Sequence, residues 1–323
     1  MMRRRWVTAI AAGAGATVIA GAVTLVLLAG NPPGEVLAPS LLEVSGTQSA
    51  GVDDSMPVAH PAPGDPAMPD PPDVPDPPVV PVVPTALSSD ALAALPEARY
   101  DSVIVGLLGE PSQSSQLPAQ AYSLDSRVAL YGSDRSTPIA TLPAVNFLGE
   151  PTVIVSVEVE RGWARILTPA RQSLPSANGG SAPAQTSAWI AKNALRDARP
   201  LSERIIVSVS AGTLTILKGE RIETVYSVAV GTEETPTPTG VTGYLQARYL
   251  DPAQNQTVHP VQLTSLHSAH ADEPYGGSDG GLIGLHYSNV ARGSVSHGCV
   301  RLDADAITAI NALPLGTPIT IDP

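Results

Sequence analysis

The clearest alternation of apolar and polar residues lies in the C-terminal part of the chain. Ile205, Val207 and Val209 alternate with their neighbours, and two glycine-containing turns then reverse the chain direction. A period of two bounded by turn residues predicts β-strands joined as hairpins. We therefore expect three consecutive antiparallel strands, the third running from 222 to 230, and a fourth strand at 244–249.

The end of the chain predicts one helix inside this β-rich part. Asp303 can cap a helix from 304 to 312 that carries an apolar face, and a final strand is expected at 317–321. Residues 203–323 are therefore expected to form one domain that is mostly β with a single flanking helix.

A second group of short strands precedes this domain. Residues 122–196 contain stretches of β-branched and aromatic residues, such as Val128–Tyr131, with turn residues between them. This spacing, together with Trp163 and Trp189, resembles a small Src-homology-3-like β-barrel. We expect such a barrel over residues 122–196.

The N-terminus has the features of a targeting segment. Three arginines at positions 3–5 precede an apolar run from Trp6 to Ala29, and a bilayer-spanning helix needs about 20 apolar residues. Positive charge on the N-terminal side predicts that the rest of the chain lies outside the cytoplasm. Residues 1–30 are expected to be either a signal peptide or a retained signal-anchor transmembrane helix.

Residues 31–95 are expected to be a disordered stalk. They are rich in Pro and Ala, and Pro-Asp and Val-Pro steps recur between Pro61 and Pro84. Such sequences favour extended polyproline II and deny the backbone a hydrogen-bond ladder.

Composition narrows the function. The net charge of −12 argues against nucleic-acid binding, which needs a basic face to neutralise phosphates. The chain has one cysteine, Cys299. A single cysteine cannot form an intramolecular disulfide, so a lone thiol in an exported protein points to chemistry.

The segment Ser-His-Gly-Cys-Val-Arg-Leu at 296–302 carries this thiol. A thiol becomes a strong nucleophile when a partner such as an imidazole lowers its pKa and shuttles its proton. His297 and His286 both precede Cys299 closely, and the spacing alone allows either to act. Gly298 lets a substrate approach the main chain, whose N–H groups could stabilise an oxyanion.

This heptapeptide resembles the signature of the L,D-transpeptidase catalytic domain (the YkuD family). Three further segments agree in order: Thr-Pro-Thr-Pro-Thr-Gly at 235–240, Ile-Gly-Leu-His at 283–286 and Gly-Thr-Pro-Ile at 316–319. The resemblance covers residues 203–323 and implies the β-sandwich of that family with its flanking helix.

The resemblance also implies a catalytic set. Cys299 would attack the carbonyl between the third and fourth residues of a peptidoglycan stem peptide, and His286 would accept and return the proton. The main-chain carbonyl of Tyr287 would hold the histidine tautomer. Backbone N–H groups of His297, Gly298 and Cys299 itself would line the oxyanion pocket.

Substrate and partners follow from the same resemblance. The resemblance places Arg301 where the family binds the stem peptide. Ser296, Tyr275 and Gly281 are further expected substrate-binding residues, although Tyr275 could equally anchor its loop. Donor and acceptor stem peptides are the expected partners, joined as direct 3→3 cross-links after release of the terminal D-alanine by a monomer without a cofactor. β-Lactams of the carbapenem type are the expected covalent inhibitors.

Other functions stay open at this point. Water in place of the acceptor amine would make the protein an L,D-carboxypeptidase. A non-catalytic wall-binding protein would use the barrel, which could equally be a spacer. His267, His270 and Asp272 could bind a metal together with His286, although histidines in a flexible surface loop are commoner and the spacing matches no known zinc pattern.

Two features depart from the family pattern. Tyr287 stands where many members have glycine after the histidine, so the space beside the base is expected to be narrow. The loop from His286 to Ser296 is shorter than common, which could change the choice of acceptor.

Overall fold

The computed structural model of the protein describes residues 84, 86–111, 117–276 and 279–323. The expected membrane segment and most of the expected stalk lie outside these residues. Within the described ranges, no helix combines the length and apolar character needed to cross a bilayer. The last part of the expected stalk differs from the prediction, because Ser89–Ala93 form the short helix α1. The Ser88 hydroxyl accepts a hydrogen bond from the Ala91 N–H at 3.2 Å and so caps this helix.

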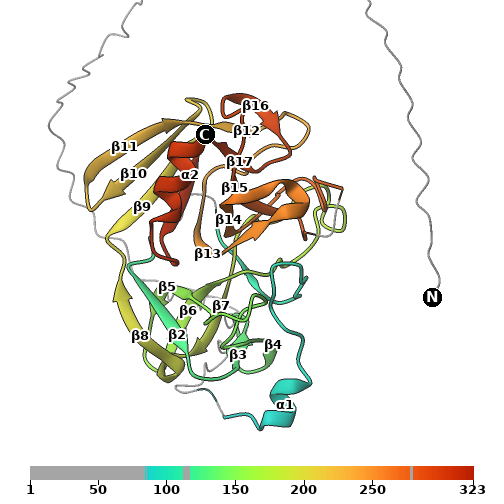
Figure 1. Cartoon of the computed structure of the whole chain (residues 1–323). Helices are drawn as coiled ribbons and strands as arrows, with labels where there is room; N and C mark the ends of the chain where they lie inside the picture. The colour runs from blue at the N-terminus through green and yellow to red at the C-terminus, as the bar shows by residue number, and fades with distance from the viewer. Residues whose placement is uncertain (1–83, 85, 112–116, 277–278) are drawn as a thin grey trace, which may run out of the picture. The chain divides into compact units, whose positions relative to one another are not determined.

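The described part of the chain is mainly β and contains two sheets (Figure 1). The N-terminal sheet has the strand order β4-β3-β7-β6-β5-β2-β8, with β1 beside β7. Its elements are β1 Leu108–Gly109, β2 Gln120–Leu124, β3 Val128–Tyr131, β4 Pro138–Leu142, β5 Ile154–Val159, β6 Trp163–Thr168, β7 Thr186–Ala191, the 3₁₀ turn η1 Lys192–Ala194 and β8 Leu195–Pro200.

The N-terminal sheet extends beyond the range 122–196 predicted for the barrel, since β1 begins before this range and β8 ends after it. Both expected tryptophans are buried in it. Trp163 meets the ring of Tyr131 edge-on at 5.1 Å, and the Arg135 guanidinium lies 3.4 Å from the Trp189 ring centroid. Aromatic packing therefore anchors one end of this sheet.

The C-terminal sheet has ten strands in the order β11-β10-β9-β18-β13-β14-β15-β17-β12-β16. Its elements are β9 Glu203–Ser208, β10 Thr213–Lys218, β11 Arg221–Ser227, β12 Ala229–Gly231, β13 Val241–Asp251, the 3₁₀ turn η2 Pro252–Gln254, β14 Gln256–His267, β15 Leu282–Tyr287, β16 Gly293–Ser296, β17 Val300–Leu302, α2 Ala304–Asn311 and β18 Pro318–Asp322.

The predicted helix is confirmed as α2. The Asp303 carboxylate accepts the Ala306 N–H at 2.9 Å, and Ile307 and Ile310 are fully buried against the sheet. Figure 1 shows α2 lying over the C-terminal sheet. Burial of one apolar stripe stabilises this short helix, since eight residues alone would not stay helical in water.

The expected single strand from 222 to 230 is wrong. β11 ends at Ser227, and β12 pairs with β16 and β17 elsewhere in the sheet. β11 is an exposed edge strand, whereas all three residues of β12 are buried. β-Branched and aromatic residues occur on both sides of the break, so the local pattern does not show where the chain leaves the edge of the sheet for its interior.

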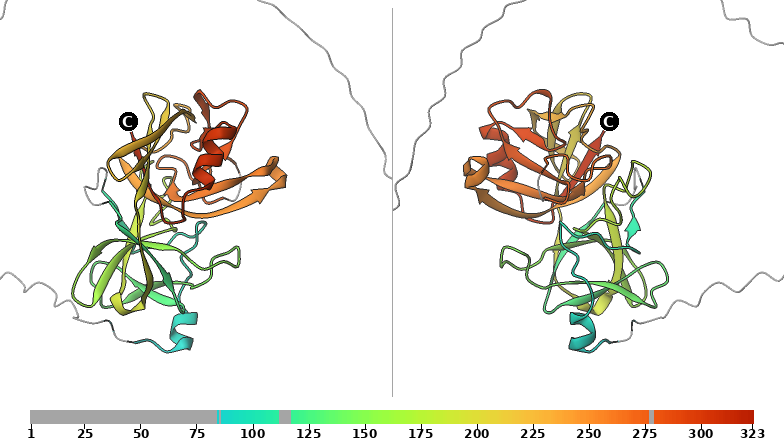
Figure 2. Two further views of the ribbon diagram at one scale, coloured as in Figure 1. Left: turned by 60° about the vertical axis from the view of Figure 1, so that its left-hand side comes forward. Right: turned by 90° about the vertical axis from the view of Figure 1, so that its right-hand side faces the viewer.

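The two sheets meet along the end of β14. There the His267 N–H donates to the Ala184 carbonyl at 2.8 Å, and the Ala182 N–H donates to the Ala269 carbonyl at 2.9 Å. Figure 2 shows the green N-terminal strands and the yellow-to-red C-terminal strands adjoining in both views. Backbone hydrogen bonds therefore join the segment before β7 to the end of β14.

Candidate active site

Cys299 lies in the turn between β16 and β17. β17 runs parallel to β15 with Arg301 paired to His286, so the same register brings Gly284 beside Cys299. The Gly284 N–H donates to the Cys299 Sγ at 3.4 Å. Because side chains alternate along a strand, His286, Cys299 and Arg301 share one face. Gly284 has no side chain, which leaves the space over the sulfur open.

The thiol and the His286 ring line one cleft of about 390 Å³. Both sheets contribute to its wall, which is rich in aromatic and aliphatic side chains. Asp279 is the only carboxylate among the lining residues. Besides Cys299, Gly284 and His286, these residues are Tyr100, Phe147, Tyr249, Gln254, Val261, Leu263, Tyr275, Asp279 and Leu282. A mostly apolar cleft with few polar groups is typical of a ligand site.

Hydrogen bonds fix the tautomer of His286. Its Nδ1 lies 3.1 Å from the Tyr287 carbonyl oxygen. A carbonyl only accepts, so Nδ1 carries the proton and Nε2 keeps the lone pair of a base. The Gln256 side-chain amide donates to the same carbonyl at 3.0 Å and steadies it. Gln256 was not expected at the site, and its position at the start of β14 gives no sequence signal for this role.

Tyr287 does not narrow the cleft. Its hydroxyl donates to the Asn289 side chain at 2.5 Å, and its ring packs on His259 with centroids 4.9 Å apart. The Tyr287 side chain is also absent from the cleft lining. The expected crowding beside the base is therefore wrong.

Electrostatics keep both reacting groups neutral at rest. Burial raises the pKa of the Cys299 thiol, and the Gly284 N–H offsets only part of this effect. Burial lowers the pKa of His286, and the positive charge of Arg301 adds to it. The expectation that an imidazole lowers the thiol pKa is thus wrong for the resting protein. A neutral His286 and a neutral Cys299 thiol line the same cleft. The thiol is therefore expected to lose its proton during the attack on the substrate and not before it.

Ser296 holds the cysteine turn together. Its buried hydroxyl donates to the Cys299 carbonyl at 2.5 Å and accepts the Gly298 N–H at 3.2 Å. The expected substrate-binding role of Ser296 and the oxyanion role of the Gly298 N–H are therefore not available in this arrangement. The oxyanion role of the His297 and Cys299 N–H groups stays a prediction. Gly298 itself has φ +111°, a conformation that L-residues rarely adopt.

Thr237 supports the same turn from the other side. Its buried hydroxyl accepts the Gly231 N–H at 2.8 Å and donates to the Gly298 carbonyl at 2.7 Å. Thr237 belongs to the Thr-Pro repeat that supported the family resemblance, but its contact with the cysteine turn could not be read from spacing.

Replacing Thr237 with valine is expected to lower the free energy of unfolding by about 1–3 kcal/mol, because two buried polar groups lose their partner. Urea titration of the full chain measures this. Thr239→Val is the matched control, since Thr239 is exposed in the same loop and should change stability by less than about 0.5 kcal/mol. Equal stability of the two variants would contradict the bridging role.

The other three residues expected to bind substrate differ in whether they reach the cleft. Tyr275 lines the cleft, is 52% exposed and meets the exposed His297 ring edge-on at 5.4 Å. Arg301 is half-buried on the face of the reacting groups, but it is not among the cleft-lining residues. Gly281 is buried against the Arg171 side chain, where a Cβ atom would lie 2.9 Å from Nη1. It therefore serves packing rather than substrate contact.

The expected flexible histidine loop is wrong for His267. This residue ends β14, is 1% exposed, and its Nε2 lies 2.8 Å from the Tyr100 carbonyl. Asp272 instead accepts hydrogen bonds from Ser176. Within the described ranges, no three His, Cys, Asp or Glu side chains are grouped so that they could hold a metal ion.

Burial lowers the pKa of His267 from 6.5 to about 4. Between these pH values the unfolded chain binds more protons than the folded protein, so acidification favours unfolding. Stability present above pH 6.5 is lost as the pH falls toward 4, in total about 3 kcal/mol from this residue.

Chemical unfolding at several pH values measures this loss. His267→Gln should flatten the dependence, whereas His270→Gln, which changes an exposed histidine nearby, should not. An unchanged pH dependence in His267→Gln would contradict the assignment.

Comparisons with known proteins agree on one family. Residues 202–321 match the model of the family described as "YkuD: L,D-transpeptidase catalytic domain". The chain is 30% identical over 155 residues to "Putative L,D-transpeptidase YkuD" of Bacillus subtilis (strain 168), a match that covers 47% of this chain and 83% of that protein.

Solved structures were matched as well. An L,D-transpeptidase from Mycobacterium smegmatis is 14% identical, with 53% of this chain and 91% of that chain covered and a TM-score of 0.31. L,D-transpeptidase 3 from Mycobacterium tuberculosis, in complex with a faropenem-derived adduct, has the same identity and coverage and a TM-score of 0.32.

Proposed function

This chain belongs to the YkuD family of L,D-transpeptidase catalytic domains, and on that basis we propose that it cross-links peptidoglycan through an acyl-enzyme on Cys299. One observation carries the proposal. Cys299 and His286 lie on one face of neighbouring parallel strands and open into one cleft, with the histidine Nδ1 already bonded to a carbonyl. This geometry matches a nucleophile, a base and the group that orients the base.

The first half-reaction forms a thioester. The Cys299 sulfur attacks the carbonyl between the third and fourth stem residues while its proton passes to His286 Nε2. Backbone N–H groups of His297 and Cys299 stabilise the oxyanion of the tetrahedral intermediate. His286 then protonates the departing amine, and D-alanine leaves. The neutral resting pair suits this order, because no separated charges need desolvation before substrate enters.

The second half-reaction releases the enzyme. The amine of a second stem loses a proton to His286 and attacks the thioester carbonyl. The C–S bond breaks, a 3→3 amide forms and the thiol regains its proton. Water in place of the amine gives the carboxypeptidase reaction by the same steps.

Product analysis tests this proposal. The full chain is incubated with a disaccharide tetrapeptide, and the products are separated by mass. Free D-alanine with a cross-linked dimer is expected, whereas tripeptide alone would indicate the carboxypeptidase. Chelation by EDTA should not change the rate. Absence of D-alanine release would overturn the proposal.

We also propose that the protein works outside the cytoplasm as a monomer. The arginines at 3–5 and the apolar run after them support a signal peptide or anchor, followed by the Pro-rich stalk. The N-terminal sheet would be a barrel of the Src-homology-3-like type. Carbapenem-type β-lactams should acylate Cys299. Cell fractionation, with protease added to intact cells, tests the location.

A further inference from the structure

One wall of the thiol cleft comes from the N-terminal part of the chain. Tyr100, from the segment before β1, and Phe147, from the connection between β4 and β5, line the same cleft as Cys299. Their rings lie 4.7 Å apart and tilted by 54°. Phe147 is the only phenylalanine of the chain and is 42% exposed. Because the Phe147 ring lines the cleft and is partly exposed, it is available to contact a bound ligand.

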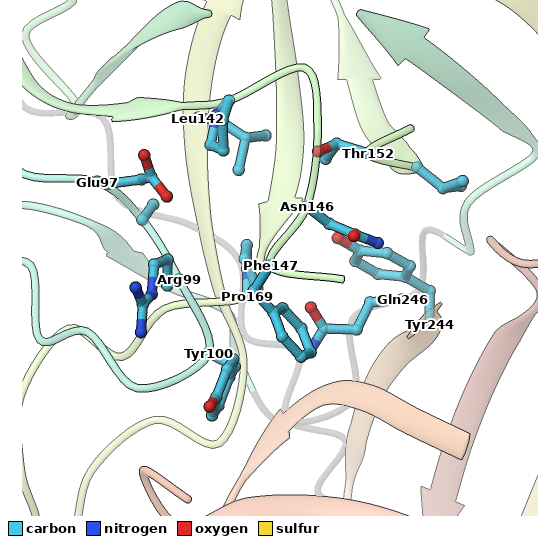
Figure 3. Close-up of a pocket in the computed structure, with 13 residues that line it drawn as sticks. Glu97, Arg99, Tyr100, Leu142, Asn146, Phe147, Thr152, Pro169, Tyr244 and Gln246 are labelled. Atoms are coloured by element: carbon cyan, nitrogen blue, oxygen red, sulfur yellow. The ribbon is translucent and has the colours of Figure 1, made fainter. Parts of the chain in front are cut away.

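Both rings share cavities with residues of the C-terminal sheet. Figure 3 shows Tyr100 and Phe147 lining a smaller cavity together with Tyr244 and Gln246 of β13. Tyr100 also packs on an apolar cluster of the C-terminal sheet that includes Val261. The position of this wall is therefore set by both sheets.

His267 fixes the backbone of this wall. Its Nε2 donates to the Tyr100 carbonyl at 2.8 Å from the buried end of β14. The depressed pKa of His267 keeps the ring neutral, so it remains a single donor at physiological pH. Tyr100 is thus bonded to the strand that runs past the cleft.

Arg171 holds the segment that follows β14. Its side chain belongs to the N-terminal part, is 1% exposed, and donates to the carbonyls of Ser268 at 2.5 Å, Ala271 at 3.0 Å and Asp272 at 2.7 Å. These residues lead to Tyr275, which lines the cleft. A buried guanidinium is costly unless its donors are satisfied. Three main-chain carbonyls accept hydrogen bonds from its two terminal nitrogens, whereas its buried Nε has no partner among the described residues.

From these contacts we propose that the N-terminal sheet is a working part of the substrate site. The Tyr100–Phe147 wall contacts the donor stem peptide, and Arg171 is a positioning residue for the segment that carries Tyr275. This inference rests on the proposed function for the identity of its ligand. It assigns to the N-terminal part a role other than spacer or independent wall-binding module.

Peptide binding to a Cys299→Ala protein tests the wall without turnover. Calorimetry with a disaccharide tetrapeptide should give a Kd about tenfold higher when Phe147→Ala is added. Phe147→Tyr keeps the ring and should restore the Kd. Because Phe147 is exposed, its truncation should not prevent folding. An unchanged Kd in Phe147→Ala would overturn the inference.

Arg171→Met tests the positioning role. It should raise the Kd at temperatures where the protein stays folded, whereas Arg199→Met should not. Arg199 is the matched control, because it also crosses between the sheets, donating to the Leu315 carbonyl away from the cleft. Should Arg171→Met fail to fold, the comparison of Phe147→Ala with Phe147→Tyr still tests the inference.

Peptide binding without D-alanine release from the unaltered protein would overturn the proposed function alone. Absence of peptide binding would overturn both the proposed function and this inference.

Discussion

Replacing Cys299 with alanine is expected to end D-alanine release, with kcat/KM falling by more than about 10⁴-fold, the scale of loss on removing the nucleophile of an acyl-transfer enzyme. No other described residue offers a thiol to the cleft. Without the sulfur no thioester can form, and oxyanion donors alone give little rate. Intact mass after incubation with a carbapenem or a stem tetrapeptide should show one adduct on the unaltered chain and none on Cys299→Ala.

Two further variants sharpen this result. Cys299→Ser keeps the size of the side chain but replaces the thiol by an alcohol that ionises far less readily, so its loss should approach that of alanine. Ser294→Ala changes an exposed residue of neighbouring β16 and should retain full activity. An adduct that persists on Cys299→Ala would refute the acyl-enzyme.

Replacing His286 with glutamine is expected to lower kcat/KM by about 10²- to 10⁴-fold, the usual contribution of a general base. Glutamine can fill the space but cannot take the thiol proton at neutral pH. The dependence of activity on pH gives a second test of this role for His286. Burial holds the pKa of His286 below its ordinary 6.5, so the neutral base persists into mildly acid solution. Activity should therefore fall on acidification with an apparent pKa below 6.5.

His286→Gln should remove this acid limb, and His270→Gln should preserve it. His297→Gln provides the discriminating comparison, because sequence spacing allowed either histidine beside the cysteine to act as the base. It removes an exposed ring but keeps the backbone N–H, so the acid limb should survive. Loss of the limb in His297→Gln instead would reassign the base.

The local sequence pattern was sufficient to predict those parts of the fold and of the site that depend on residues adjacent in the chain. The capped helix after Asp303 and the hairpins from β9 to β11 follow from periodicity and turns, and the thiol segment follows from residue types that carry chemistry. These signals are short in range, so one sequence contains them.

The remaining parts depend on residues that meet only after folding. Thr237 reaches the cysteine turn, Gln256 reaches the carbonyl behind the base, and Tyr100 reaches the cleft from another sheet. A threonine or glutamine has the same local appearance whether it faces solvent or bridges two buried groups. The pKa of Cys299 was mispredicted for the same reason, since desolvation is set by packing and not by the adjacent residues.

The guanidinium at Arg171 also constrains how the protein can be dissected. The family match begins at residue 202, yet a truncation there would strip the three carbonyls at 268, 271 and 272 of their donor and uncover the imidazole at His267. The resulting fragment would leave polar groups at and beyond the end of β14 without partners, and it would lack the Tyr100–Phe147 pair that lines the thiol cleft. A self-sufficient minimal enzyme should therefore include Tyr100 and retain both sheets.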